Sequence, residues 1–265
     1  GILQIASRLV PPANGKNAVF EYAIGGITDL VTTKNGEKYR ASVRKGLAEA
    51  IEKCNDYDNK AFLLTQLAKC ATKEDMPVFS KYLKDSKLSD LVIMLLTSIP
   101  GNDTELAYLV KNTDLPHLAL AKMVTARNIQ GVEDVLLGWT NNSDAKTLKE
   151  VYNALATVGT SKSVDVLADA AKKVNYGPDP TFATNAYAKL LESLENDTKT
   201  VQKGAKALMK SETSAVRCAG LNLLLKSSGK DGVKNVLSAL KDDDIEYRNT
   251  ALACGLEYCG EPIFT

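Results

Sequence analysis

The feature that most constrains the fold is a pattern near the C-terminal end that occurs twice in succession. The segment 216–221, with the sequence VRCAGL, recurs at 247–252 as YRNTAL, so corresponding residues lie 31 positions apart. A fixed offset of this size is typical of a protein built from stacked repeats, and it is not typical of a fold with one closed core. The sequence therefore predicts a repeat array.

Apolar residues at three- and four-residue spacing predict that each copy contains two amphipathic helices. In the second copy, the first apolar stripe comprises Val233, Val236, Leu237 and Leu240, and the other comprises Ile245, Leu252 and Leu256. The aspartates at 242–244 between them suit the start of a helix, where free N–H groups need acceptors. Because one hairpin has only half a core, we expect each stripe, Leu252 included, to be buried against a neighbouring hairpin.

The same spacing predicts helical hairpins through most of the chain. We expect helices at 37–54 and 58–70, 74–84 and 89–98, 103–112 and 114–127, 132–140 and 144–158, 163–173 and 181–195, and 198–210 with a helix that Ser214 opens. The first helices begin 28 to 35 residues apart from position 75 onward. The prediction is an all-α fold, an α-solenoid of about seven or eight repeats that spans 1–265 as a single array.

The ends of the array are expected to differ from its middle. Residues 1–36 are predicted to form capping helices, one halted by Pro11-Pro12 and one at 17–33 that is kinked, or closely crossed by another helix, at Gly25-Gly26. Repeats are expected over 37–258. Residues 259–265 are interpreted as a tail that leads to a missing region, and the start at Gly1 without Met suggests a piece of a longer protein.

Glycines and one long connection mark the boundaries between hairpins. Gly101, Gly131, Gly159 and Gly229 are expected to adopt left-handed conformations after second helices. The connection 174–180, with the sequence VNYGPDP, is longer and richer in proline than the others. It is either a plain insertion or a loop that is used for contact.

The string of a short helix that ends in Ala-Leu-Lys-Asp, an aspartate turn and then Tyr-Arg-x-x-Ala-Leu resembles the HEAT repeat, in the short form of phycobilisome-lyase-type proteins. The resemblance is best over 230–255, weaker over 211–228, and rests on periodicity upstream. In that family the arginine of the motif often bonds an acidic residue of the preceding turn and joins adjacent repeats. The resemblance therefore implies structural roles for Arg217 and Arg248.

In HEAT proteins the second helix of each hairpin lines the concave face. Carried over to this chain, the resemblance implies a binding face that includes Lys122, Lys149, Tyr152, Asn153, Asn185, Lys189, Asn222 and Asn249. The aromatic residues Tyr108, Trp139, Tyr152 and Tyr187 are either exposed for an interface or packed between repeats, and packing is favoured for Trp139.

Composition argues against several classes of partner. The formal net charge is +1, so no overall positive field attracts nucleic acid. Only six of the 33 Lys and Arg residues are arginines. Because arginine is the side chain best suited to binding phosphate or reading guanine, this scarcity also disfavours nucleic-acid binding. No stretch has the roughly 20 apolar residues that a membrane-spanning helix needs. We therefore expect neither nucleic-acid binding nor membrane insertion.

No motif indicates catalysis, a cofactor or a metal. The single histidine, His117, follows Pro116 at the predicted start of a helix, without a second histidine or a nucleophile motif beside it. The five cysteines include no C-x-x-C pair. They are interpreted as buried thiols, and a disulfide between Cys54 and Cys70 is the alternative.

These observations predict a non-catalytic scaffold that binds a protein partner or positions adjacent domains of the same chain. The alternative is an enzyme on a HEAT-like frame, such as a DNA-alkylation glycosylase or a bilin lyase. The segment GKNAVFEYAIGGITDLV at 15–31 also resembles the helical-repeat regions of large exported bacterial proteins that carry a 3-keto-disaccharide hydrolase domain. That resemblance implies an extracytoplasmic setting, with this piece as the accessory region of a carbohydrate-active enzyme.

Overall fold

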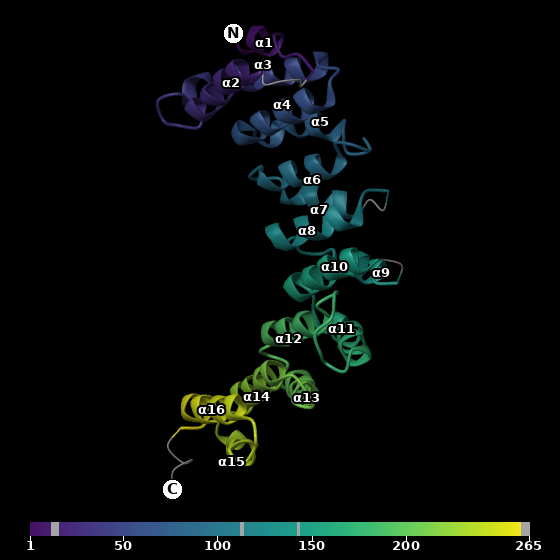
Figure 1. Ribbon diagram of the computed structural model, residues 1–265, viewed down its shortest axis with the longest axis vertical. Coiled ribbons are helices and arrows are strands. Elements are labelled where there is room, and N and C mark those ends of the chain that lie inside the picture. Colours follow the sequence, from purple (N-terminus) through teal and green to yellow (C-terminus); the bar gives the residue numbers. More distant parts are fainter. Residues whose placement is uncertain (12–15, 112–113, 142–143, 261–265) are drawn as a thin grey trace. The chain divides into compact units, whose positions relative to one another are not determined.

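The computed structural model describes residues 1–11, 16–111, 114–141 and 144–260, and all regular structure within these ranges is helical. The chain divides into two compact units, Gly1–Ile129 and Gln130–Thr265. Within the described ranges, each unit contains four successive pairs of α-helices (Figure 1). The prediction of an all-α fold is confirmed.

In the first unit, each second helix packs against the second helix of the next pair. The helices are α1 (Ile2–Ala6), α2 (Ala18–Val31), α3 (Arg40–Lys53), α4 (Tyr57–Cys70), α5 (Met76–Ser80), α6 (Ser89–Ser98), α7 (Asp103–Val110) and α8 (His117–Arg127). Helices α2, α4, α6 and α8 contact one another in that order, and each of the last three also contacts the helix before it in the chain. The core between them is formed by fully buried side chains such as Leu67, Ile93 and Leu120.

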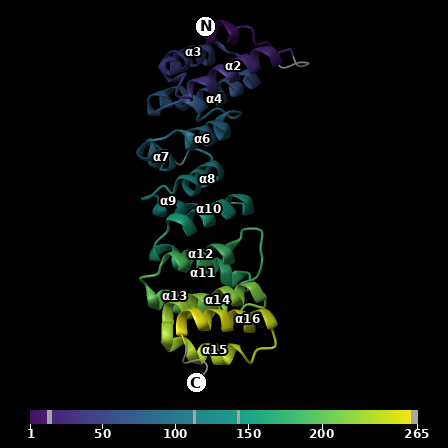
Figure 2. The same cartoon turned by 90° about the vertical axis from the view of Figure 1, so that its left-hand side faces the viewer.

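The second unit repeats this arrangement. Its helices are α9 (Glu133–Trp139), α10 (Ala145–Val158), α11 (Ser161–Lys173), α12 (Ala183–Ser193), α13 (Thr198–Leu208), α14 (Ser214–Ser228), α15 (Val233–Ala239) and α16 (Ile245–Cys254). Helices α10, α12, α14 and α16 contact one another in order, and Figure 2 shows the later pairs from a second direction. Trp139 is buried, as predicted. Short helices η1 (Glu37–Tyr39), η2 (Lys73–Asp75), η3 (Gly229–Gly232) and η4 (Gly255–Cys259) complete the described regular structure.

Three predicted segments fall partly outside the described residues, and one of them is the capping segment 1–36, which includes 12–15. The predicted helix at 103–112 ends on such a residue, and so does most of the predicted tail at 259–265. The remaining helices begin and end within a few residues of their predicted bounds. In the part of the chain that the structure describes, no helix combines the length and the apolar character needed to cross a bilayer.

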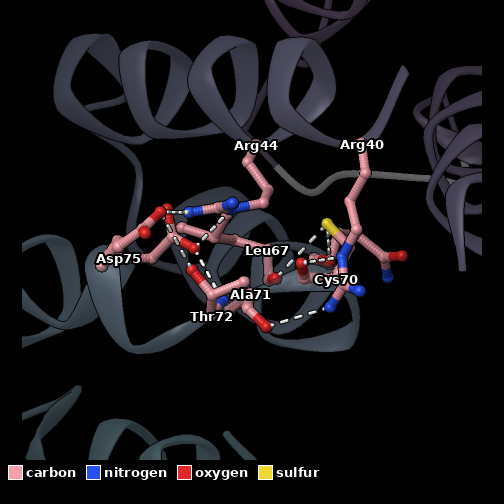
Figure 3. A network of polar contacts seen from close by, with 9 residues as sticks. Arg40, Arg44, Leu67, Cys70, Ala71, Thr72 and Asp75 are labelled. Carbon is pink, nitrogen blue, oxygen red and sulfur yellow. Dashed lines mark hydrogen bonds and ion pairs between the residues drawn. The ribbon is translucent and has the colours of Figure 1, made fainter. Parts of the chain in front are cut away.

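Arginines connect successive helix pairs in the first unit (Figure 3). Arg40 on α3 donates from Nε to the carbonyl oxygen of Cys70, at 2.8 Å. Arg44, one turn later, donates from Nε to the Asp75 carboxylate at 2.6 Å, and this hydrogen bond raises the pKa of Arg44. Cys70 is the last residue of α4, so Arg40 joins the two helices of its own pair. Asp75 lies among the residues that begin the next pair, so Arg44 joins the α3–α4 pair to that pair.

Arg127 makes a comparable connection at the end of α8. Its Nη1 donates to the carbonyl oxygens of Thr97 at 2.9 Å and Ile99 at 2.8 Å, while Nη2 pairs with Asp103. These carbonyl groups lie in the last turn of α6 and at the residue after it, where backbone acceptors have no partner within the helix. The guanidinium group therefore caps one helix from the next pair.

The motif arginines of the second unit have structural roles, as the HEAT resemblance implies, but one contact differs from the expected direction. Arg248 donates from Nη1 to the carbonyl oxygen of Asp242 in its own preceding turn, at 2.6 Å. Arg217 also pairs with Asp242, which belongs to the turn of the following helix pair. Arg217 additionally lies 4.3 Å from the ring centroid of Tyr247. Arg217 thus joins the last two pairs through the later turn.

The expected burial of Leu252 is wrong. Leu252 and Leu256 are 41% and 50% exposed on the last helix pair, and Ile245 is also exposed. The buried face of α16 consists of Tyr247, Ala251 and Cys254. Helix α16 packs on α14 with this mixed face, so its more apolar stripe points away from the core.

The predicted close crossing at Gly25-Gly26 and the predicted left-handed conformation at Gly159 are also wrong. Helix α2 continues through Gly25 and Gly26, and a Cβ atom at either position would meet no other atom closer than 3.9 Å, so no helix crosses closely there. Gly159 has an extended backbone, with φ −72° and ψ 159°. Glycine is nevertheless favoured at 159, because a Cβ atom would lie 2.2 Å from the carbonyl oxygen of Leu155. Left-handed conformations are confirmed at Gly101, Gly131 and Gly229.

The five cysteines are free thiols. Cys70, Cys254 and Cys259 are buried, whereas Cys54 and Cys218 are half-buried. Burial raises the pKa of the Cys54 and Cys70 thiols. The structure agrees with the interpretation as thiols and shows no Cys54–Cys70 disulfide.

Candidate functional site

Four of the eight residues predicted for a binding face lie together on one groove of the second unit. The groove has a volume of about 240 Å³ and is lined by Lys149, Asn153, Phe182, Asn185, Ala186 and Lys189. The first two come from α10 and the last three from α12, the second helices of successive pairs. The groove is therefore formed largely by second helices, from which the predicted binding residues were drawn.

Helical spacing places these side chains in two facing rows. On α10, Lys149, Asn153 and Thr157 are four residues apart, and residues at this spacing share one face of a helix. On α12, Asn185 and Lys189 are likewise four residues apart. The opposite faces of both helices carry buried residues, which fix the direction of the polar rows.

Phe182 completes the groove, and it was not among the residues predicted from sequence. It is the residue before α12, its side chain is 48% exposed, and its backbone is left-handed with φ 55°. The ammonium nitrogen of Lys149 lies 4.4 Å from the centroid of its ring. The only feature of the sequence that could have indicated Phe182 as a binding residue is its position as an aromatic residue between an irregular connection and a helix.

The conformation of the long connection before Phe182 positions this residue at the groove. Three of the four non-glycine residues with positive φ in the described part of the chain lie between 175 and 182. The carboxylate of Asp179 accepts from the backbone N–H groups of Thr181 at 2.7 Å and Ala183 at 3.0 Å. The hydroxyl group of Ser211 donates to the carbonyl oxygen of Tyr176 at 2.8 Å. These bonds fasten both the start and the end of the connection.

The two lysines of the groove carry charge that no carboxylate balances. The Nζ atom of Lys189 donates to Thr157 Oγ1 at 3.0 Å and lies 3.4 Å from Asn153 Oδ1. Within the described ranges, neither Lys149 nor Lys189 has an acidic side chain at ion-pair distance.

Two other lysines of the second unit, Lys162 and Lys226, do have acidic partners. Lys226 pairs with Glu195 at 2.6 Å, and Lys162 pairs with Asp134 at 3.3 Å. In both pairs, the partners lie about one repeat apart in the sequence, as Lys189 and Thr157 do. Lys189 therefore also contacts side chains about one repeat away, but its partners, Thr157 and Asn153, are neutral.

The other predicted residues do not join this groove. Lys122 lines a separate groove of about 360 Å³ in the first unit, with the apolar side chains of Met94 and Leu118. Asn222 on α14 accepts a hydrogen bond from the Cys254 thiol at 3.5 Å. Asn249 is exposed on α16.

Tyr152 and the remaining aromatic residues separate into two groups. Tyr152 is only 8% exposed, and burial raises its pKa, so it packs within the unit. Tyr187 is also buried, and burial raises its pKa to about 12. Tyr108 on α7 is exposed. Of the two alternatives for these tyrosines, the structure shows packing for Tyr152 and Tyr187.

The chemistry of the groove suits binding. Its lining offers two ammonium groups, two carboxamides and a phenyl ring, without a carboxylate, imidazole, thiol or hydroxyl group. Among the described residues, no three His, Cys, Asp or Glu side chains are arranged to hold a metal ion. His117 lies half-buried at the first residue of α8, in the first unit.

Comparison with known proteins adds no family assignment. The sequence matches no protein-family model, and it matches no curated protein.

Proposed function

We propose that the chain is a non-catalytic, HEAT-like repeat scaffold whose helix pairs stack as an α-solenoid and that binds a segment of a protein partner in the α10–α12 groove. The partner is a separate protein or an adjacent domain of a longer chain. The observation that carries the proposal is the convergence of four exposed or half-exposed polar residues from two helices on one groove.

The repeat character is supported by polar contacts between residues about one repeat apart. Such contacts occur in both units, for example between Arg44 and Asp75 and between Lys226 and Glu195. The successive contacts among second helices point the same way. In a repeat array each unit is stabilised mainly by its neighbours, and the exposed face of the stack is available for binding.

The size and lining of the groove favour part of a peptide chain over a small molecule. Sites for small molecules usually have volumes of roughly 300–1,000 Å³ and bury most of the ligand. The α10–α12 groove is smaller, and most of its lining residues are exposed. It fits one or two side chains of a longer segment. The carboxamides of Asn153 and Asn185 each offer a donor and an acceptor, which matches the groups of a peptide backbone.

Site-specific photo-crosslinking tests the proposal. A benzophenone side chain is introduced at Asn185 in the groove and, as a control, at the exposed Lys172 on α11. We expect a discrete protein adduct from position 185 in cells that express the protein, and no such adduct from position 172. Equal adducts from both positions, or none from position 185, would contradict binding in the groove.

A further inference from the structure

Resting on the proposed function, we infer that the α10–α12 groove binds an acidic segment, in which two carboxylate side chains flank an apolar or aromatic residue. Lys149 and Lys189 would pair with the carboxylates, Phe182 would contact the apolar residue, and the two asparagines would bond the backbone between them.

The first argument is charge. Lys149 and Lys189 both line the groove and have no acidic neighbour within ion-pair distance in the described ranges. Lysines at comparable spacing between pairs, such as Lys162 and Lys226, do have one. Positive patches generally meet negative ones across an interface. Two ammonium groups on one groove without acidic neighbours are therefore complementary to negative charge on the partner.

The second argument concerns hydrogen bonding. Asn185 is exposed, and its side-chain amide donates or accepts no hydrogen bond within the described part of the protein. The Oδ1 atom of Asn153 faces Lys189 at 3.4 Å, which leaves its amide N–H groups for another acceptor. An extended backbone offers a carbonyl oxygen and an N–H group at each residue. The groove can thus hold a peptide between its two charged positions.

The third argument is the conformation of Phe182. The left-handed region is strained for a bulky residue, and such strain is concentrated at functional sites. Here the strained backbone holds a half-exposed phenyl ring on the groove instead of burying it. Exposed, rigid aromatic rings are favoured at binding surfaces. An apolar residue next to the carboxylates would cover this ring.

Phosphate polymers fit these observations less well. The groove contains no arginine, the side chain that grips phosphate with two parallel bonds. The net charge of the chain is only +1. An acidic protein segment needs single carboxylate contacts and an apolar contact, and the groove offers both.

Fluorescence anisotropy with synthetic peptides tests this inference. The probes are short fluorescein-labelled peptides with Glu-Phe-Glu, Gln-Phe-Gln or Lys-Phe-Lys at the centre of the same Gly-Ser background. We expect the Glu-Phe-Glu peptide to bind tightest. Its affinity should fall as NaCl rises from about 0.01 M to about 1 M, because the Debye length shortens from about 30 Å to about 3 Å.

Charge reversal in the groove provides the decisive comparison. The Lys149→Glu/Lys189→Glu variant should bind the Glu-Phe-Glu peptide at least about tenfold more weakly and the Lys-Phe-Lys peptide more tightly, since attractive contacts become repulsive. The control is Lys172→Glu/Lys203→Glu, which changes the same net charge at exposed positions on α11 and α13. It should leave both affinities within about twofold. Circular dichroism verifies that each variant is folded.

Three results would overturn the inference. The first is that the Glu-Phe-Glu and Gln-Phe-Gln peptides bind equally well, or that no peptide binds. The second is that the groove and control reversals change peptide affinity equally. The third is that a thymidine oligonucleotide binds more tightly than the acidic peptide. A partner that crosslinks at position 185 of the protein, but is indifferent to reversal of Lys149 and Lys189, would refute the acidic segment and leave the proposed function intact. Absence of any adduct from position 185 would refute the proposed function itself.

Discussion

The two copies of the repeated motif occupy equivalent helices, yet their corresponding leucines lie in opposite environments. Leu221 and Leu225 on α14 are fully buried, whereas Leu252 and Leu256, 31 residues later on the last helix pair, are 41% and 50% exposed. Helix α16 covers α14 in the first case. In the described residues, no helix covers α16 in the same way.

This difference shows that corresponding residues of the two copies occupy equivalent helix positions but need not be equally buried. The burial of Leu221 depends on the next helix pair, not on the motif around it. Residues that α14 buries against the next helix pair are therefore exposed on α16, against which the described residues place no further pair. The following predictions test this comparison, from the largest expected effect to the smallest.

Leu221→Ala should produce the largest loss of stability. Leu221 is fully buried between α14 and its neighbours, and truncation of such a leucine typically costs about 2–5 kcal/mol through lost burial and a cavity. Urea denaturation followed by circular dichroism measures the loss. A cost below about 1 kcal/mol would mean that α16 does not cover this position in solution.

Gly220→Ala should destabilise the protein by a smaller amount, about 1–3 kcal/mol. A Cβ atom at this position would lie 2.8 Å from the carbonyl oxygen of Ala205 and 2.9 Å from the backbone nitrogen of Met209. Helices α13 and α14 must therefore move apart. The corresponding residue of the next copy is Ala251, which carries a Cβ atom. An unchanged or higher midpoint in urea would contradict the close crossing.

Arg217→Met should make stability less sensitive to acid. A backbone N–H bond from Asp244 and then the guanidinium of Arg217 lower the pKa of Asp242 in the folded state. A lowered pKa stabilises the fold above the unfolded value of about 3.9, and this contribution is lost as the pH falls through the folded value. The difference in unfolding free energy between wild type and variant should therefore shrink below about pH 4. A constant difference from pH 7 to pH 3 would exclude the charge interaction. Arg248→Met offers the matched comparison, because Arg248 contacts a carbonyl oxygen.

Leu252→Ala should have the smallest effect, below about 1 kcal/mol, because exposed positions contribute little to stability. The same urea titration as for Leu221→Ala gives the value, and the substitution is chemically identical. A loss of about 2–5 kcal/mol would show that Leu252 is covered in solution.

Much of the fold can be predicted from the sequence, because helix periodicity is a local property. Helix α6 is found at the predicted Ser89–Ser98, for example. The buried face of α16 could not be predicted from hydrophobicity, because it consists of Tyr247, Ala251 and Cys254 while the leucines face outward. The continuity of α2 through Gly25 and Gly26 likewise depends on its tertiary contacts, which outweigh the helix propensity of glycine.

The candidate site, like the fold, could be predicted only in part from the sequence. Lys149, Asn153, Asn185 and Lys189 follow from their places on second helices, since residues four apart share a face. Phe182 does not, because its place in the groove depends on left-handed backbone at Asn175, Tyr176 and Phe182, none of which is glycine. The absence of acidic partners for the lysines depends on which residues lie one repeat away, and only the packing of helices shows that.

If the groove lysines serve a ligand and not the fold, their removal should separate binding from stability. The most direct measurement compares the Lys149→Met/Lys189→Met variant with wild type in two assays, urea denaturation and titration with the Glu-Phe-Glu peptide. We predict an unfolding free energy within about 0.5 kcal/mol of wild type, as for other surface substitutions, together with a clear loss of peptide affinity. Lower stability with unchanged peptide affinity would contradict a binding role for the groove.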